Sequence, residues 1–178
     1  MKMTRVVDFD KARTAAAARR GYRNWRSRFQ GSFDTGTRAA DLSDSTLAFL
    51  ARGSEESAFY LYDLIMQVLH LGSGFEIREL KAADRMAVMD RYLFVLDRLR
   101  FEMMKRLDWL EGYPGEDVSL VDMTVQYEDI APGLQARVPA LSRMHPEHAT
   151  FESVSAVEKE SVIRKLIPEA LEGFPRES

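Results

Sequence analysis

Five arginines and three aromatic residues lie together in residues 19–29, close to the start of the chain. Guanidinium groups bind phosphates and carboxylates, and aromatic rings stack on nucleobases or fill apolar pockets. The expected partner of a segment with this composition is an acidic protein or a nucleic acid, and an anionic membrane surface would attract such a segment as well. The pattern therefore predicts a partner-binding segment made of Arg19, Arg20, Tyr22, Arg23, Trp25, Arg26, Arg28 and Phe29.

The distribution of charge along the chain supports this prediction. Residues 1–38 contain ten Lys/Arg and three Asp/Glu, a net charge of +7, whereas residues 39–178 contain fifteen and twenty-five, a net charge of −10. The overall charge of −3 therefore conceals a basic arm on an acidic body. Local charge, rather than total charge, selects a partner.

The aromatic residues of this segment have a simpler interpretation, in which they pack on the chain's own body. Ala15, Ala18, Tyr22, Trp25 and Phe29 are separated by three and four residues, so they share one face of a helix. The arginines lie largely off this face, where they could be solvated or pair with the acidic body. The two interpretations differ in one observable, which is whether the rings are buried.

A second candidate site lies on a largely apolar segment. Steps of four and three residues place Glu56, Tyr60, Asp63, Gln67 and His70 on one helix face. An aspartate and a histidine two turns apart could exchange protons in a cleft, which would indicate a small ligand-binding protein or an enzyme. The simpler interpretation is that these polar residues form the exposed stripe of an otherwise buried helix.

Motifs for metal or nucleophilic chemistry are sparse. The chain has three histidines and no cysteine, which excludes disulfides, thiolate metal sites and cysteine nucleophiles. The stretch His145-Pro146-Glu147-His148 offers two histidines and a carboxylate, but it lacks a third ligand at a fitting spacing, so we expect a solvated loop. The sequence predicts no metal site and no cofactor, and it favours a protein that is not an enzyme.

Helical periodicity dominates the chain, so we expect an all-α fold of five to seven helices. The segments 54–71 and 78–111 are expected to form a central antiparallel pair, and a basic helix is expected within residues 9–30. A capping box formed by Ser155 and Glu158 predicts the start of the last helix, which Pro168 should kink or split. Short helices are favoured over strands between residues 113 and 150, because no partner strand is evident.

The expected organisation is a basic N-terminal arm, residues 1–38, on a single helical domain, residues 39–178. No signal peptide and no apolar run long enough to span a membrane is evident, so we expect a cytoplasmic protein. The apolar stripe of the segment 78–111 also suggests a homo-oligomer built along that helix.

Overall fold

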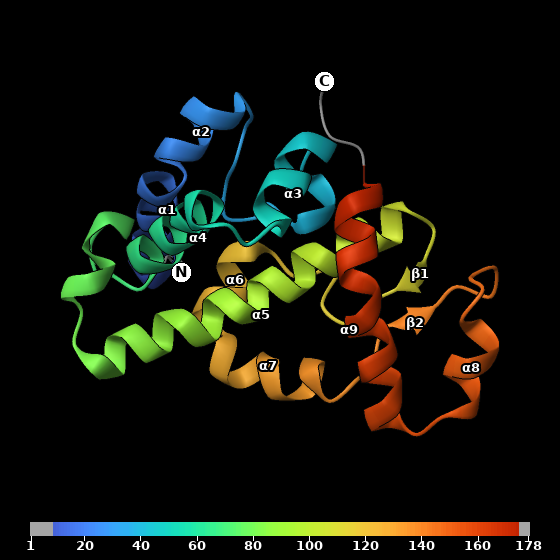
Figure 1. Ribbon diagram of the computed structural model, residues 1–178. Coiled ribbons are helices and arrows are strands. Elements are labelled where there is room, and N and C mark those ends of the chain that lie inside the picture. Colours follow the sequence, from blue (N-terminus) through green and yellow to red (C-terminus); the bar gives the residue numbers. More distant parts are fainter. Residues whose placement is uncertain (1–8, 175–178) are drawn as a thin grey trace, which may run out of the picture.

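The computed structural model describes residues 9–174 of the 178-residue chain and confirms the predicted all-α class (Figure 1). Helices make up nearly all of the regular structure, and one small antiparallel sheet completes it. More helices form than were expected, because the basic segment divides in two and three short helices precede the last one. In chain order the elements are α1 (Phe9–Gly21), α2 (Arg23–Phe29), the 3-10 helix η1 (Ala39–Asp41), α3 (Asp44–Ala51), α4 (Glu55–Val68), the 3-10 helix η2 (Gly74–Glu79), α5 (Ala82–Arg106), β1 (Leu110–Gly112), α6 (Leu120–Val125), α7 (Tyr127–Gln135), β2 (Ala140–Leu141), α8 (His148–Ser153) and α9 (Ala156–Gly173).

The long helix α5 is the central element, and α3, α4, α6 and α9 pack against it (Figure 1). Its 25 residues extend over about 37 Å. The apolar stripe that suggested a homo-oligomer is largely covered within the chain, and Met86 and Leu93 are the large apolar residues of α5 that stay exposed. Over the described part of the chain, no helix combines the length and the apolar character needed to cross a bilayer.

Serine caps determine where several helices begin. The hydroxyl groups of Ser43, Ser54 and Ser155 each accept a backbone N–H from the first turn of α3, α4 and α9. Such caps satisfy amide groups that have no partner within the helix. The predicted capping box at the start of α9 is present, and α9 runs unbroken through Pro168.

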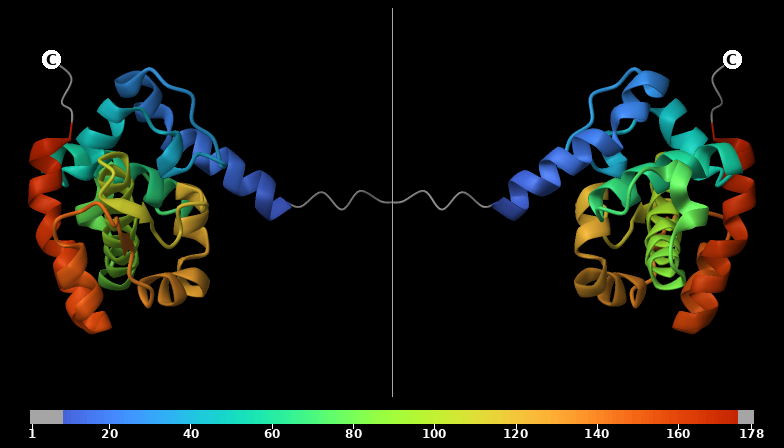
Figure 2. Two further views of the ribbon diagram at one scale, coloured as in Figure 1. Left: turned by 90° about the vertical axis from the view of Figure 1, so that its right-hand side faces the viewer. Right: turned by 90° about the vertical axis from the view of Figure 1, so that its left-hand side faces the viewer.

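α1 packs on α4, and α2 is joined to α4 by the indole N–H of Trp25, although the first turns of α1 reach beyond the rest of the molecule (Figure 2). Gly21 allows this close approach, because a Cβ atom at that position would lie 3.0 Å from the Cα atom of Leu64. Glycine is unfavourable inside a helix, but at position 21 its lack of a side chain allows α1 and α4 to pack closely. The first eight residues of the predicted arm lie outside the described residues.

A short sheet that the sequence did not predict joins the end of α5 to the segment before α8. Leu110 of β1 lies opposite Leu141 of β2, and both side chains are buried. Strands of three and two residues are too short to show the alternation by which strands are recognised.

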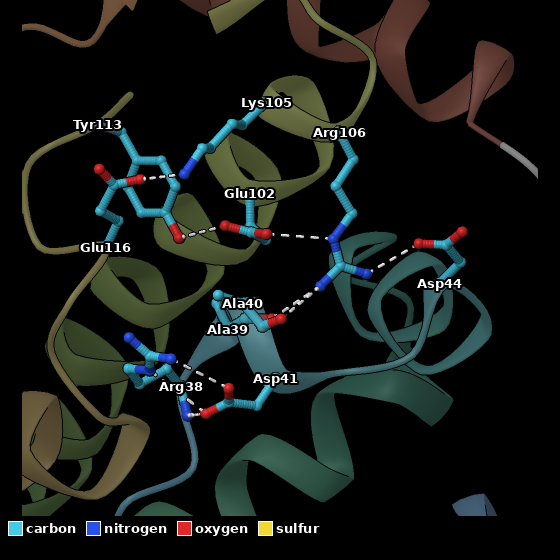
Figure 3. A network of polar contacts seen from close by, with 10 residues as sticks. All are labelled: Arg38, Ala39, Ala40, Asp41, Asp44, Glu102, Lys105, Arg106, Tyr113 and Glu116. Carbon is cyan, nitrogen blue, oxygen red and sulfur yellow. Dashed lines mark hydrogen bonds and ion pairs between the residues drawn. The ribbon is translucent and has the colours of Figure 1, made fainter. Parts of the chain in front are cut away.

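A polar network around the buried Glu102 connects η1 and α3 to α5 (Figure 3). Glu102 is 4 % exposed and accepts hydrogen bonds from the hydroxyl of Tyr113 at 2.8 Å and from Nε of Arg106 at 3.1 Å. The same guanidinium pairs with Asp44 at 2.9 Å and donates to the backbone carbonyl groups of Ala39 and Ala40. A buried carboxylate of this kind is stable because both of its oxygen atoms have donors.

Candidate interaction surface

The aromatic residues of the predicted binding segment turn inward. Tyr22 and Trp25 are both 0 % exposed, and Phe29 is partly buried. The indole N–H of Trp25 donates to the backbone carbonyl of Tyr60 at 2.8 Å, and its ring meets that of Tyr22 edge-on at 5.0 Å. These rings thus belong to the hydrophobic core, which corrects the prediction that Tyr22 and Trp25 contact a partner.

The arginines of the same segment lie on the outside. Arg19, Arg20, Arg23, Arg26 and Arg28 are all exposed, and we call these five residues the arginine segment. Within residues 9–174 these side chains make few polar contacts. Arg26 donates to the carbonyl of Arg19, Arg20 to the side chain of Gln67 at 3.4 Å, and Arg28 lies 3.8 Å from Glu56.

Aromatic rings continue from the arginine segment across α4 to η2. Phe29 contacts Tyr60 with ring centroids 5.3 Å apart, and Tyr60 contacts Phe59 at 5.4 Å. Phe59 in turn lies 4.5 Å from Phe75, which is 78 % exposed. A shallow hollow lined by Arg28, Phe59 and Phe75, among others, lies where α2 meets this row.

An apolar groove of about 510 Å³ begins at Phe75 and runs between α4, η2 and the start of α5. Arg78, Arg85 and Glu55 contribute the charged part of its lining. We use the name apolar groove for the surface formed by Phe59, Tyr62, Phe75, Ile77 and Met89. The groove was not predicted, because Phe75 and Ile77 follow the connector Gly72-Ser73-Gly74 and show no helical period.

In the structure, Asp63 and His70 of the second predicted site lie in different environments. Asp63 is 2 % exposed, and its two carboxylate oxygens accept from the side chain of Asn24 at 3.0 Å and from the backbone N–H of Gly74 at 2.8 Å. His70 is exposed and follows the end of α4 with φ of 59°. Desolvation, followed by the positive charges of Arg13 and Arg20, lowers the pKa of His70. Asp63 therefore acts as a structural acceptor between α2, α4 and η2.

The histidine-containing loop forms a local turn. The backbone N–H of Glu147 donates to Nδ1 of His145 at 3.1 Å, and His148 begins α8. Among residues 9–174, no group of three or more His, Cys, Asp or Glu side chains could hold a metal ion.

His145 also lines a cleft of about 710 Å³ at the C-terminal end of α5, far along that helix from the apolar groove. Trp109 meets the His145 ring edge-on at 5.3 Å, and α9 contributes Lys165 and Glu169. Asp108, with φ of 61°, also lines this cleft. The polar residues of this cleft come from separate elements, which the sequence could not bring together.

Comparison with known proteins finds no family model, no curated protein and no solved structure that matches this chain.

Proposed function

We propose that this chain is a non-enzymatic interaction protein whose arginine segment binds an acidic partner. The observation that carries the proposal is the burial of Trp25 beneath helices whose arginines are all exposed. Within residues 9–174, only Arg28 of the arginine segment has a carboxylate at ion-pair distance. The other four guanidinium groups can donate to an external carboxylate or phosphate without first breaking an ion pair within these residues.

The fixed position of α1 and α2 favours binding. Tyr22 and Trp25 hold these helices on α4, so the backbone that carries the arginines is ordered before any partner arrives. An ordered surface loses less conformational entropy on binding than a disordered basic tail would. Basic residues arranged in this way also increase the rate of encounter with an acidic partner.

The alternative function, a ligand-binding protein or enzyme acting through Asp63 and His70, has less support. Both carboxylate oxygens of Asp63 already accept structural hydrogen bonds. No hydrogen bond joins Asp63 to His70 in the part of the chain that the structure describes. A proton-exchanging pair would require the two groups to meet each other or a shared substrate.

A charge-matched pair of variants tests the proposal. The first changes Arg19, Arg23 and Arg26 to glutamine, and the control changes the exposed residues Arg52, Arg143 and Lys165 to glutamine. Fluorescence anisotropy would follow the binding of a labelled poly-glutamate peptide and of an oligothymidylate. We expect the first variant to bind its preferred probe about tenfold more weakly than the control, as the loss of three exposed ion pairs would give.

Equal weakening in both variants would show that net charge alone drives the binding, and it would contradict the proposal. Measurable binding of neither probe by the unmodified protein would contradict it as well. Circular dichroism of both variants should match that of the parent, because all six substituted side chains are exposed.

A further inference from the structure

The apolar groove displays an aromatic side chain from a firmly held turn. The backbone N–H of Gly74 donates to the buried carboxylate of Asp63, and a Cβ at Gly74 would lie 2.9 Å from the backbone nitrogen of Asp63. The side chain of Glu76 accepts from the N–H of Ser73 at 3.1 Å. Phe75 lies between these anchors and remains 78 % exposed, so its exposure is a property of the fold.

Two of the three charged residues that line this groove are positive. They are Arg78 and Arg85, and none of the described carboxylates pairs with either of them. Arg28 lies at the adjoining hollow, 3.8 Å from Glu56. The guanidinium of Arg85 donates to the carbonyl groups of Arg78 and Leu80, each at 2.9 Å, which fixes it at the rim. Glu55 supplies the opposing charge within the lining.

We infer that the apolar groove receives the apolar side chains of an acidic amphipathic helix on a partner protein. This inference rests on the proposed function and identifies the class of acidic partner. Leucine-like side chains of such a helix would cover Phe59, Phe75 and Met89, while its carboxylates would meet Arg28, Arg78 and Arg85. The groove and the arginine segment then form one continuous surface, joined at Arg28.

The apolar lining favours a protein over a nucleic acid. A nucleic acid presents phosphates and flat bases, and it has no aliphatic side chain to fill a groove that contains Ile77 and Met89. The rings best placed by sequence to stack on bases, Tyr22 and Trp25, are in the core. A helix with apolar residues on one face and carboxylates on the other complements both parts of the surface.

A pair of peptides tests this inference. One has leucine and glutamate at helical spacing, and the other has the same composition in an order without helical period. Fluorescence anisotropy would be measured for the unmodified protein, Phe75→Ser and the control Met144→Ser. The control removes another exposed apolar side chain (91 % exposed), which lines the cleft beyond the C-terminal end of α5. We expect Phe75→Ser to bind the periodic peptide about tenfold more weakly and Met144→Ser to bind it as the parent does.

The outcomes separate the inference from the proposed function. If Phe75→Ser binds the periodic peptide as well as the parent does, the groove is not the docking site. The proposed function would still be supported in that case if substitution of Arg19, Arg23 and Arg26 weakens the binding of poly-glutamate. Tighter binding of an oligothymidylate than of the periodic peptide would overturn the inference. Concentration-dependent self-association that Phe75→Ser abolishes would overturn it too, because the occupant would then be a second copy of this chain.

Discussion

Trp25 donates its indole N–H to the backbone carbonyl of Tyr60 across 2.8 Å, and this bond joins the basic helix α2 to α4. The Trp25 ring also meets Phe29 edge-on at 5.7 Å and Phe33 at 5.4 Å. A segment with the composition of a basic binding arm is thereby part of the folded body. Within residues 9–29, the basic side chains are therefore carried by helices that pack on the rest of the chain.

Replacing Trp25 with phenylalanine should destabilise the protein strongly. The change removes the bond to the Tyr60 carbonyl and leaves a cavity in a fully buried site. We expect a loss of about 2–4 kcal/mol in the free energy of unfolding, measured by urea denaturation. Arg23→Gln, an exposed change in the same helix, should cost less than about 0.5 kcal/mol. Equal effects of the two changes would show that α2 is only loosely attached to α4.

Removing the Tyr113 hydroxyl should lower the free energy of unfolding, because the buried carboxylate of Glu102 then lacks one of its donors. In Tyr113→Phe, Glu102 loses its 2.8 Å donor while it stays buried, and we expect a loss of about 1.5–3 kcal/mol in the free energy of unfolding. The matched change in the same network is Asp44→Asn. The Asp44 side chain is 63 % exposed, so we expect this change to lower the free energy of unfolding by less than about 1 kcal/mol. Thermal or urea unfolding measures both. A larger effect for Asp44→Asn would contradict the assignment of Glu102 as the centre of the network.

Alkaline pH should unfold the protein before two of its tyrosines ionise. Burial, followed by the charge of Asp34, raises the pKa of Tyr22 far above its ordinary value of 10.0. Burial, followed by the charge of Glu102, does the same for the pKa of Tyr113. Above pH 10 the native state therefore holds protons that the unfolded state releases, so the stability that these groups contribute is complete below about pH 10 and falls as pH rises.

Absorbance at 295 nm and circular dichroism, recorded together during the titration, would check this. We expect part of the phenolate absorbance to appear only when helical ellipticity is lost. Complete ionisation of all six tyrosines with the ellipticity unchanged would contradict the buried placement of Tyr22 and Tyr113.

Asp108→Gly should stabilise the protein. Asp108 follows α5 with φ of 61°, a position that favours glycine, and it places a negative charge just beyond the negative end of the helix dipole. We expect a gain of roughly 1 kcal/mol, or about 2–4 °C in Tm for a chain of this size. Asparagine tolerates the same φ, so Asp108→Asn removes only the charge and measures the electrostatic part of the gain in stability. A lower Tm for both variants would reveal a stabilising role for the Asp108 carboxylate.

The elements best predicted from sequence are those in which the helical spacing continues over many residues and a capping residue marks the start. Three–four spacing identified α4, α5 and α9, and Ser54 and Ser155 capped the helices expected to begin at those positions. The pairing of Leu110 with Leu141 depends on a contact between residues 31 positions apart, which no local pattern encodes. The helix expected at 78–111 is shorter in the structure, because η2 extends to Glu79 and α5 ends at Arg106.

The candidate surface was predicted only in part, for a related reason. Spacing places Tyr22 and Trp25 on one helix face, but it does not reveal what covers that face. The exposed arginines follow from the same spacing, since they lie off the aromatic face. Phe75 carries no periodic signal, and its role depends on Phe59 and Arg85, which come from other elements.

The most direct test of the continuous arginine and apolar surface is to map the contact by nuclear magnetic resonance. Amide chemical shifts of the labelled protein would be followed while the periodic leucine–glutamate peptide is added. We predict that the largest changes fall in α2, in η2 around Phe75 and in the first turns of α5 near Arg85. Changes concentrated instead at the cleft beside Trp109, or no changes at saturating peptide, would contradict the account.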